Sequence, residues 1–261
     1  MTTTGLPEPL LRLSGINKSF GAVHVLHDVD FAVYPGQVTA LVGDNGAGKS
    51  TLVKTIAGIY TAESGDRYFA GQPVTIDGPR DAAALGIEVV YQDLALCDNL
   101  DIVQNMFLGR EETRGVVLDE NTMEARARET LASLSVRTVK SVRQSVSSLS
   151  GGQRQTVAIA KSVLWNSKVV LLDEPTAALG VAQTRQVLDL VRRLADQGLG
   201  VVLISHNMVD VFEVADRITA LYLGRVAADV ATADVTHSQV VELITAGRSG
   251  DLGLTTSGTT A

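Results

Sequence analysis

The segment Gly43–Thr51 combines the residue types of a phosphate-binding loop at the required spacing. It fits the pattern G-x-x-x-x-G-K-S/T with Gly43, Asp44, Asn45, Gly46, Ala47, Gly48, Lys49, Ser50 and Thr51. In such a loop the glycines let backbone N–H groups approach the α- and β-phosphates, the lysine reaches the β- and γ-phosphates, and the serine hydroxyl can bind Mg²⁺. The pattern predicts binding of a nucleoside triphosphate; a glycine-rich turn without a ligand is the alternative.

The residues on either side predict the strand and the helix that this loop needs. The apolar run 38–42 precedes the loop and is typical of a buried strand, and residues 51–58 are helix-like. The N-terminus of that helix adds a partial positive charge behind the phosphates.

Two adjacent carboxylates follow a second apolar run. Asp173 and Glu174 come directly after Val169–Leu172, which predicts a buried strand ending in an acidic pair. Ligands of open α/β sheets bind at the carboxyl ends of the strands. We therefore expect Asp173 to hold Mg²⁺ and Glu174 to act as general base on an attacking water. Two surface or capping carboxylates are the alternative.

The segment Leu149–Gln153 opens a further helix. Its residues Ser150, Gly151, Gly152 and Gln153 can present a hydroxyl and backbone N–H groups to an anion at the helix N-terminus. Taken alone, the Ser-Gly-Gly sequence is also typical of a flexible turn.

With these three segments in this order, the chain resembles the ATP-binding-cassette (ABC) ATPase family over nearly its whole length. Gly43–Thr51 matches the family's Walker A loop, Leu149–Gln153 its signature, and Val169–Glu174 its Walker B segment. The resemblance assigns three more residues. Gln92 matches the Q-loop that contacts Mg²⁺, His206 the switch histidine at the γ-phosphate, and Phe20 the aromatic ring against adenine. Each alone has a structural alternative: an exposed amide, a capping histidine and a core aromatic residue.

One position departs from the family pattern. Many members have an aspartate in the D-loop after Walker B, whereas Thr176–Leu179 is followed here by Gly180. Because glycine has no carboxylate, the contact across a dimer that the aspartate makes is not assigned to this chain.

The resemblance implies cofactors and partners. ATP and Mg²⁺ are expected between the Walker A loop of one chain and the signature of a second copy. Segments such as Val90–Leu96 and Asn105–Glu111 look like the branch of importers for monosaccharides (ribose, xylose and fructose types), with the single-cassette form known from fructose-type systems. Transmembrane permease subunits and an extracytoplasmic sugar-binding protein are then implied. An exporter, an importer of another solute, a non-transport ABC ATPase and a regulatory module without turnover remain alternatives.

The pattern of elements predicts an α/β fold with one inserted helical part. Short strand-like runs fill residues 9–75, a helical pattern covers about 95–165, and strands and helices alternate after 168. The resemblance makes this a P-loop NTPase of ABC type, with a mainly parallel core, an N-terminal antiparallel β part and a helical insert. We expect the core at 1–94 and 166–247, the helical subdomain at 95–165, and a mobile tail at 248–261.

Composition narrows the function classes. The 261 residues are 45% hydrophobic and 20% charged, which is ordinary for a globular protein. The net charge of −7 and the 4% aromatic content disfavour nucleic-acid binding. No apolar run reaches the roughly 18 residues of a membrane span, and no signal peptide is visible, so we expect a cytoplasmic chain. The resemblance to transporter subunits implies that it is peripheral, at the cytoplasmic face of the membrane. The single Cys97 agrees with a reducing compartment.

Overall fold

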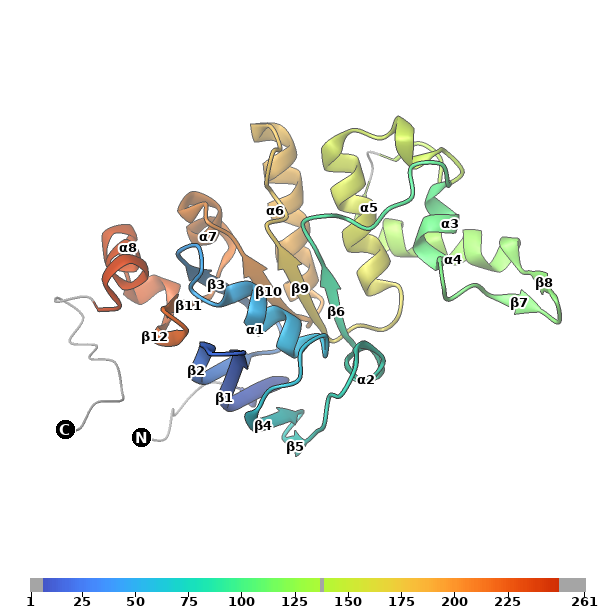
Figure 1. The fold of residues 1–261 in the computed structure, drawn as a ribbon. Helices are drawn as coiled ribbons and strands as arrows, with labels where there is room; N and C mark the ends of the chain where they lie inside the picture. Colours follow the sequence, from blue (N-terminus) through green and yellow to red (C-terminus); the bar gives the residue numbers. More distant parts are fainter. Residues whose placement is uncertain (1–6, 137–138, 249–261) are drawn as a thin grey trace.

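The computed structural model describes residues 7–136 and 139–248; of the expected tail, residues 249–261 lie outside them. A six-stranded sheet in the order β12-β11-β3-β10-β9-β6 crosses the centre of the molecule (Figure 1). Its strands are β3 (Val38–Gly43), β6 (Ile87–Val90), β9 (Val169–Asp173), β10 (Gly200–Ile204), β11 (Arg217–Tyr222) and β12 (Arg225–Ala231). All neighbours in this sheet pair in parallel except β11 and β12. The parallel strands confirm the predicted α/β core, and β3 and β9 confirm the two runs that lead into the phosphate loop and the acidic pair.

A second, antiparallel sheet is built from the N-terminal residues. It has the order β2-β1-β4-β5 and contains β1 (Leu11–Phe20), β2 (Val23–Val33), β4 (Ser64–Phe69) and β5 (Gln72–Pro73). Helix α1 (Lys49–Ile56) packs between this sheet and the parallel one (Figure 1). Together they bury one apolar cluster, so the helix behind the phosphate loop is covered on both sides.

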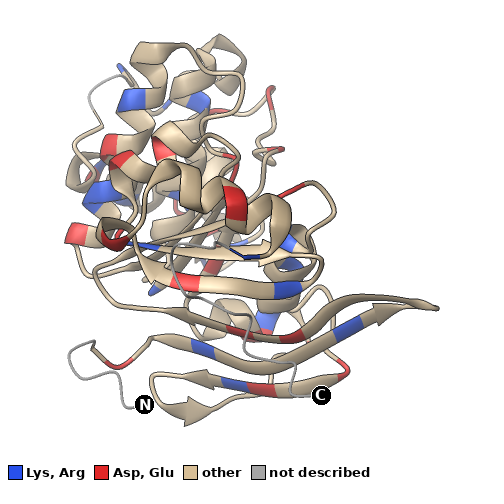
Figure 2. Ribbon diagram, turned by 90° about the vertical axis from the view of Figure 1, so that its left-hand side faces the viewer, with Lys and Arg blue, Asp and Glu red and all other residues tan. Residues whose placement is uncertain are grey.

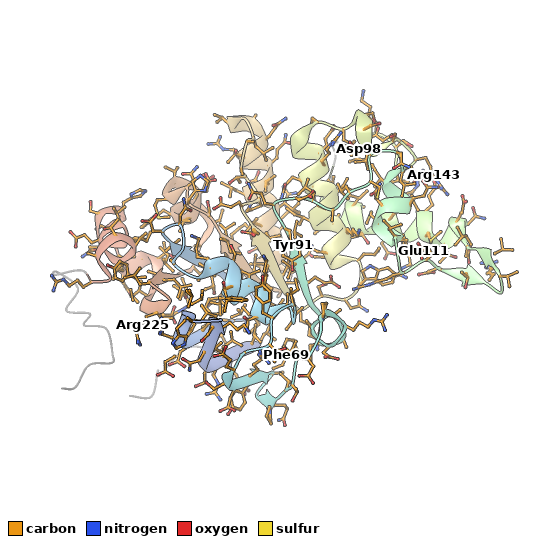
Figure 3. All side chains as sticks on the ribbon, in the orientation of Figure 1. Phe69, Tyr91, Asp98, Glu111, Arg143 and Arg225 are labelled. Atoms are coloured by element: carbon orange, nitrogen blue, oxygen red, sulfur yellow. The ribbon has the colours of Figure 1, made fainter. Side chains whose placement is uncertain are left out.

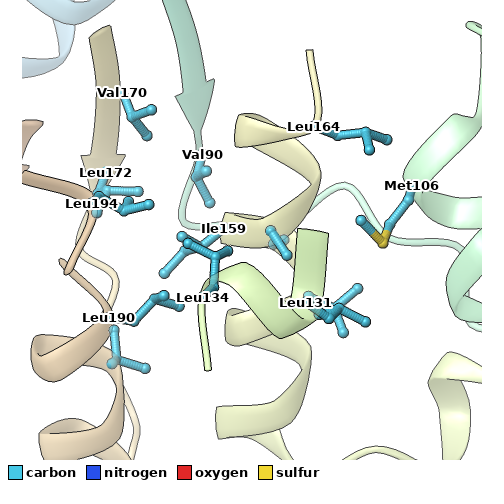
Figure 4. Close-up of a cluster of buried hydrophobic side chains, with 14 of the residues drawn as sticks. Val90, Met106, Leu131, Leu134, Ile159, Leu164, Val170, Leu172, Leu190 and Leu194 are labelled. Atoms are coloured by element: carbon cyan, nitrogen blue, oxygen red, sulfur yellow. The ribbon is translucent and has the colours of Figure 1, made fainter. Parts of the chain in front are cut away.

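The other face of the parallel sheet is covered by helices. Residues Val170 and Leu172 of β9 point to that side, towards α5 (Gly151–Val163) and α6 (Val181–Asp196), whereas Val169 and Leu171 join the cluster around α1. Figure 4 shows Val170 and Leu172 facing Leu190 and Leu194 of α6. This two-sided burial explains why β9 reads as a continuous apolar run.

The expected helical part contains α3 (Ile102–Phe107), α4 (Glu120–Ser133) and the signature helix α5. Asp119 caps α4, because its carboxylate accepts a hydrogen bond from the N–H of Thr122. The sequence did not predict the hairpin of β7 (Thr113–Arg114) and β8 (Val117–Leu118), which projects beyond α4. The boundaries 95–165 stay a prediction.

Ion pairs hold α4 in this part of the molecule. Arg143 contacts Glu124 at 2.7 Å, Glu120 at 3.2 Å and Asp101 at 3.4 Å. Figure 3 labels Arg143 beside these helices, and Figure 2 shows acidic and basic residues interleaved on the face that it presents.

The remaining elements complete the core. Helices α7 (Met208–Val214) and α8 (His237–Ala246) pack with β11 and β12 in a third apolar cluster. Helix α2 (Pro79–Ala84) precedes β6, and short 3₁₀ turns stand at Val146–Ser148 and Thr232–Asp234. Across the described part of the chain, no helix combines the length and apolar character that crossing a bilayer requires.

Candidate functional site

The phosphate loop joins the end of β3 to the start of α1, as the pattern predicts. Asp44, Asn45, Gly46 and Ser50 are exposed, while Thr51 is half-buried in the first turn of α1. No side chain caps the N-terminus of α1, and its first turn contains no acidic residue. The first N–H groups of this helix therefore lack a capping side chain, and its positive end is open to an anion.

The glycines at both ends of the loop are required by close contacts. Gly48 has φ of +104°, and a Cβ there would lie 2.9 Å from Leu26 Cδ2. A Cβ on Gly43 would lie 2.6 Å from the carbonyl oxygen of Leu221. Any side chain at either position would displace the loop from the strands behind it.

The back of the loop is tied to other elements by backbone hydrogen bonds. The N–H of Gly224, in the turn between β11 and β12, donates to the carbonyl oxygen of Ala47 at 3.0 Å. The N–H of His27 in β2 donates to the carbonyl oxygen of Gly224 at 2.8 Å. The two sheets thus hold the loop in its shape from behind.

Lys49 lies across the mouth of the loop. Its Nζ donates to the carbonyl oxygens of Gly43 at 2.7 Å and Asp44 at 3.1 Å. Burial lowers the pKa of Lys49, and the charges of Glu174, Asp44 and Asp173 partly oppose that shift. These charges are felt because the acidic pair faces the loop, so the structure brings the two predicted motifs together.

The two carboxylates of the pair have different surroundings. Burial, followed by the charge of Glu174, raises the pKa of Asp173 above its ordinary value. Glu174 has φ of +50°, an uncommon conformation for a residue with a side chain, and its N–H donates to the carbonyl oxygen of Ile204 at 2.9 Å.

Glu174 is paired with the predicted switch histidine. Oε2 of Glu174 lies 2.8 Å from Nδ1 of His206, which follows β10. The side chain of Glu174 is 16% exposed and that of His206 is 76% exposed. The histidine therefore stands at the solvent side of the carboxylate, where it can orient the group and reach a bound ligand.

Gln92 is exposed in the segment that follows β6. Its neighbour Tyr91 is half-buried, and the nearby charge of Asp173 adds to the burial that raises its pKa. Figure 3 shows Tyr91 where the chain leaves the core for the helical part. Gln92 therefore lies one residue from a side chain that faces the acidic pair.

Phe20 is at the end of β1 and is 43% exposed. Its ring contacts the ring of Tyr60 edge-to-face, with the centroids 5.0 Å apart. Because Phe20 is not buried, the alternative of a core aromatic residue is wrong, and part of the ring is open to a planar ligand.

The signature segment does not meet the phosphate loop of its own chain. Ser150 caps α5, accepting a hydrogen bond from the N–H of Gln153 at 3.3 Å, and the side chain of Gln153 accepts one from the N–H of Ser150. Gly151 and Gly152 pack on the D-loop and on the start of α6. Figure 1 places α1 and the start of α5 in different parts of the molecule. One chain therefore holds the two predicted parts of the ATP site apart, as two half-sites.

The side chains present fit a magnesium ion that is bound together with phosphates. Among the described residues, no group of three or more His, Cys, Asp or Glu side chains could hold a metal ion. Mg²⁺ ordinarily keeps several waters and takes one or two carboxylates plus substrate phosphates. Ser50, Gln92 and Asp173 supply only oxygen donors, as this mode requires.

Comparison with known proteins decides the family. The family model described as "ABC transporter" matches residues 26–177. The chain belongs to the ABC transporter family. It is 46% identical to the fructose import ATP-binding protein FrcA of Rhizobium meliloti over 245 residues, covering 91% of this chain and 94% of that protein. It is 43% identical to the xylose/arabinose import ATP-binding protein XylG of Sulfolobus acidocaldarius, covering 94% of this chain and 97% of that protein.

A solved structure of this family has the same fold. A nucleotide-free ATP-binding cassette from an ABC transporter is 26% identical to the chain, covers 86% of it with 92% of its own length, and aligns with a TM-score of 0.77. As an ABC ATPase, the chain binds and hydrolyses ATP.

The structure adds residues that motif reasoning missed. Tyr60 contacts Phe20, and the buried Asp210 of α7 contacts the D-loop through Thr176. The sequence shows that Asp210 follows His206 by four positions. It does not show that Asp210 contacts Thr176, which lies 34 residues earlier in the chain.

Proposed function

We propose that this chain is the ATP-hydrolysing subunit of a monosaccharide importer. The pairing of Glu174 with His206, at the edge of the sheet that also carries Lys49, is the observation that supports hydrolysis. The names of two relatives that align over nearly their whole length, one a fructose importer subunit and one a xylose/arabinose importer subunit, support sugar import.

Each side chain of the site has a role in this proposal. The phosphate loop and Lys49 bind the triphosphate of ATP, and the ring of Phe20 stacks on the base. Glu174 accepts a proton from the attacking water as general base, while His206 holds the carboxylate through Nδ1 and turns its other nitrogen to the γ-phosphate. A bound Mg²⁺ neutralises charge on the phosphate oxygens, and Ser50, Asp173 and Gln92 would hold it.

The two half-sites explain why a second copy is needed. In a pair of chains, Ser150 and the N–H groups of Gly151–Gln153 close over the γ-phosphate held by the partner's loop. ATP then joins two chains, and loss of the phosphate releases them.

The permease is proposed to dock on the cytoplasmic side, in a groove between the parallel sheet and the helical part. The groove has a volume of about 280 Å³ and is lined by residues that include Glu88, Tyr91, Arg110, Lys161 and Trp165. Arg110 pairs with Glu88 at 2.8 Å at its rim. Because Tyr91 faces both the groove and Asp173, a permease segment seated here would lie one side chain from the hydrolytic site. An extracytoplasmic sugar-binding protein would deliver the sugar to that permease.

Replacing Glu174 by Gln tests the hydrolytic part of the proposal. We expect phosphate release to fall by about 10²- to 10⁴-fold, because an amide cannot accept the proton. ATP binding should persist, and the variant should form an ATP-dependent dimer in gel filtration. Glu129→Gln, at an exposed position on α4, is the matched control. Undiminished phosphate release in Glu174→Gln would contradict the assignment.

Uptake of labelled sugars tests the transport part. Cells that lack the chain should lose uptake of at least one of fructose, xylose, arabinose and ribose, and the wild-type chain should restore it where Glu174→Gln does not. Unchanged uptake of all four sugars would favour another solute. Purification of the chain from its native membrane, followed by identification of the proteins that accompany it, distinguishes an importer from an exporter.

A further inference from the structure

Asp210 is a buried carboxylate whose two oxygens bind two different loops. It lies in the first turn of α7 and is only 4% exposed. Its Oδ2 accepts a hydrogen bond from Oγ1 of Thr176 at 2.7 Å, and its Oδ1 accepts one from Nδ2 of Asn207 at 2.9 Å. A buried carboxylate without such partners is strongly unfavourable, so the two bonds form together when the chain folds.

The bond to Asn207 fixes the chain next to His206. The side-chain oxygen of Asn207 accepts from the N–H of Val209 at 3.0 Å, and its backbone N–H donates to Oγ of Ser205 at 3.0 Å. With both ends of its amide bonded, Asn207 has one orientation. The backbone on the C-terminal side of His206 is therefore held in place.

The bond to Thr176 fixes the chain next to Glu174. Thr176 lies between Glu174, with φ of +50°, and Ala178, with φ of +59°. A left-handed backbone conformation is unfavourable for a residue that has a side chain. A segment with two such residues keeps its shape only when neighbouring contacts hold it, and the Thr176 hydroxyl on Asp210 is one such contact.

We propose that Asp210 is a positioning residue for ATP hydrolysis. By joining Thr176 to Asn207, it sets the separation of Glu174 and His206 and the course of the D-loop up to Gly180. The link joins residues of one chain. It therefore does not depend on the D-loop aspartate that makes a contact across a dimer in many family members and that Gly180 replaces here. The inference rests on the proposed function, because it concerns the rate of that hydrolysis.

Thr176→Val tests the link without removing the buried carboxylate. Valine has nearly the shape of threonine but no hydroxyl, so we expect kcat to fall by about tenfold or more while KM for ATP stays the same. Thr176→Ser keeps the hydroxyl and should recover most of the lost kcat. Combining Thr176→Val with Asp210→Asn should lower kcat no further than Asp210→Asn alone, because both changes break one link.

Thr219→Val is the matched control. Thr219 is buried, and its hydroxyl donates a hydrogen bond to a carboxylate as that of Thr176 does: the acceptor is Oδ1 of Asp229 at 3.2 Å, on β11 and β12, in another part of the sheet. The variant Thr219→Val should leave kcat unchanged. If Thr176→Val keeps the wild-type kcat, or if Thr219→Val lowers kcat equally, the proposal is overturned.

A readout that does not depend on turnover separates this proposal from the proposed function. The imidazole nitrogen signals of His206, assigned by comparison with His206→Ala, should shift in Thr176→Val and return in Thr176→Ser. A wild-type chain that releases no phosphate would overturn the proposed function. Unchanged His206 signals in Thr176→Val would overturn the role of Asp210.

Discussion

At the scale of single residues, the neighbouring carboxylates Asp173 and Glu174 have different surroundings and different proposed roles. Asp173 is half-buried, which disfavours its charged form. Glu174 has a left-handed backbone conformation, and its carboxylate contacts His206. An ionised carboxylate in such a place as that of Asp173 lowers stability, and Asp173 is the carboxylate that we propose as a ligand for Mg²⁺. This combination is typical of a residue kept for function and not for folding.

Asp173→Asn should therefore stabilise the nucleotide-free chain while it removes Mg²⁺-dependent hydrolysis. The raised pKa means that the folded state binds a proton more readily than the unfolded state, so the unfavourable contribution of Asp173 appears as the pH rises through the carboxyl range. We expect a melting temperature a few degrees above wild type at neutral pH. The difference should vanish below the ordinary pKa of aspartate, where both states are protonated. Equal melting curves of the two proteins at neutral pH would contradict this prediction.

At the scale of elements, the open N-terminus of α1 contrasts with the capped N-terminus of α5. Gly48 leaves the first turn of α1 without a side-chain partner, whereas Ser150 and Gln153 cap α5 reciprocally. The first arrangement leaves the positive end of α1 open, where we propose that the phosphates bind. The second keeps the signature segment ordered while its glycines pack on the D-loop and α6.

Gly180→Asp tests the departure in the D-loop. Gly180 caps α6 with ordinary φ of −75°, and nothing lies within 4 Å of a Cβ built on it. Aspartate is a better N-cap than glycine, so the free energy of unfolding should stay the same or rise by a few tenths of a kcal/mol. Urea denaturation measures this. A clear loss of stability in Gly180→Asp would show that folding requires glycine at this position.

Sequence reasoning reached the elements whose signals are local. The strand before Gly43 and the strand before Asp173 each depend on neighbouring residues, and the structure confirms them. The hairpin at Thr113–Leu118 was missed because its strands have two residues each and bury no apolar face. The contact of Asp210 with Thr176 depends on two loops that meet only after the sheet has formed.

At the scale of the whole molecule, the sheet separates the two half-sites. The phosphate loop belongs to the layer with α1 and the antiparallel sheet, and the signature belongs to the helical layer on the other face. This arrangement supports the proposal that a second chain completes the site.

Mixing two inactive variants tests the composite site. Lys49→Ala removes the phosphate-binding cation, and Ser150→Asp keeps an N-cap for α5 but places negative charge towards the partner's γ-phosphate. Each variant alone should have little ATPase activity. A mixture should regain part of it, because a mixed pair contains one site with both an intact loop and an intact signature. The same variants assayed apart are the control, and no gain on mixing would contradict a shared site.

The anchoring of the phosphate loop by Ala47 and Gly224 also affects the kinetics of the free chain. Because both sheets hold the loop in shape, we expect ATP to meet a prepared half-site and the encounter of two chains to be the slow step. Phosphate release per chain should then rise with protein concentration in the isolated chain. A permease that holds two copies side by side would replace this bulk concentration by a high local one, so that turnover no longer depends on how many chains the cell makes.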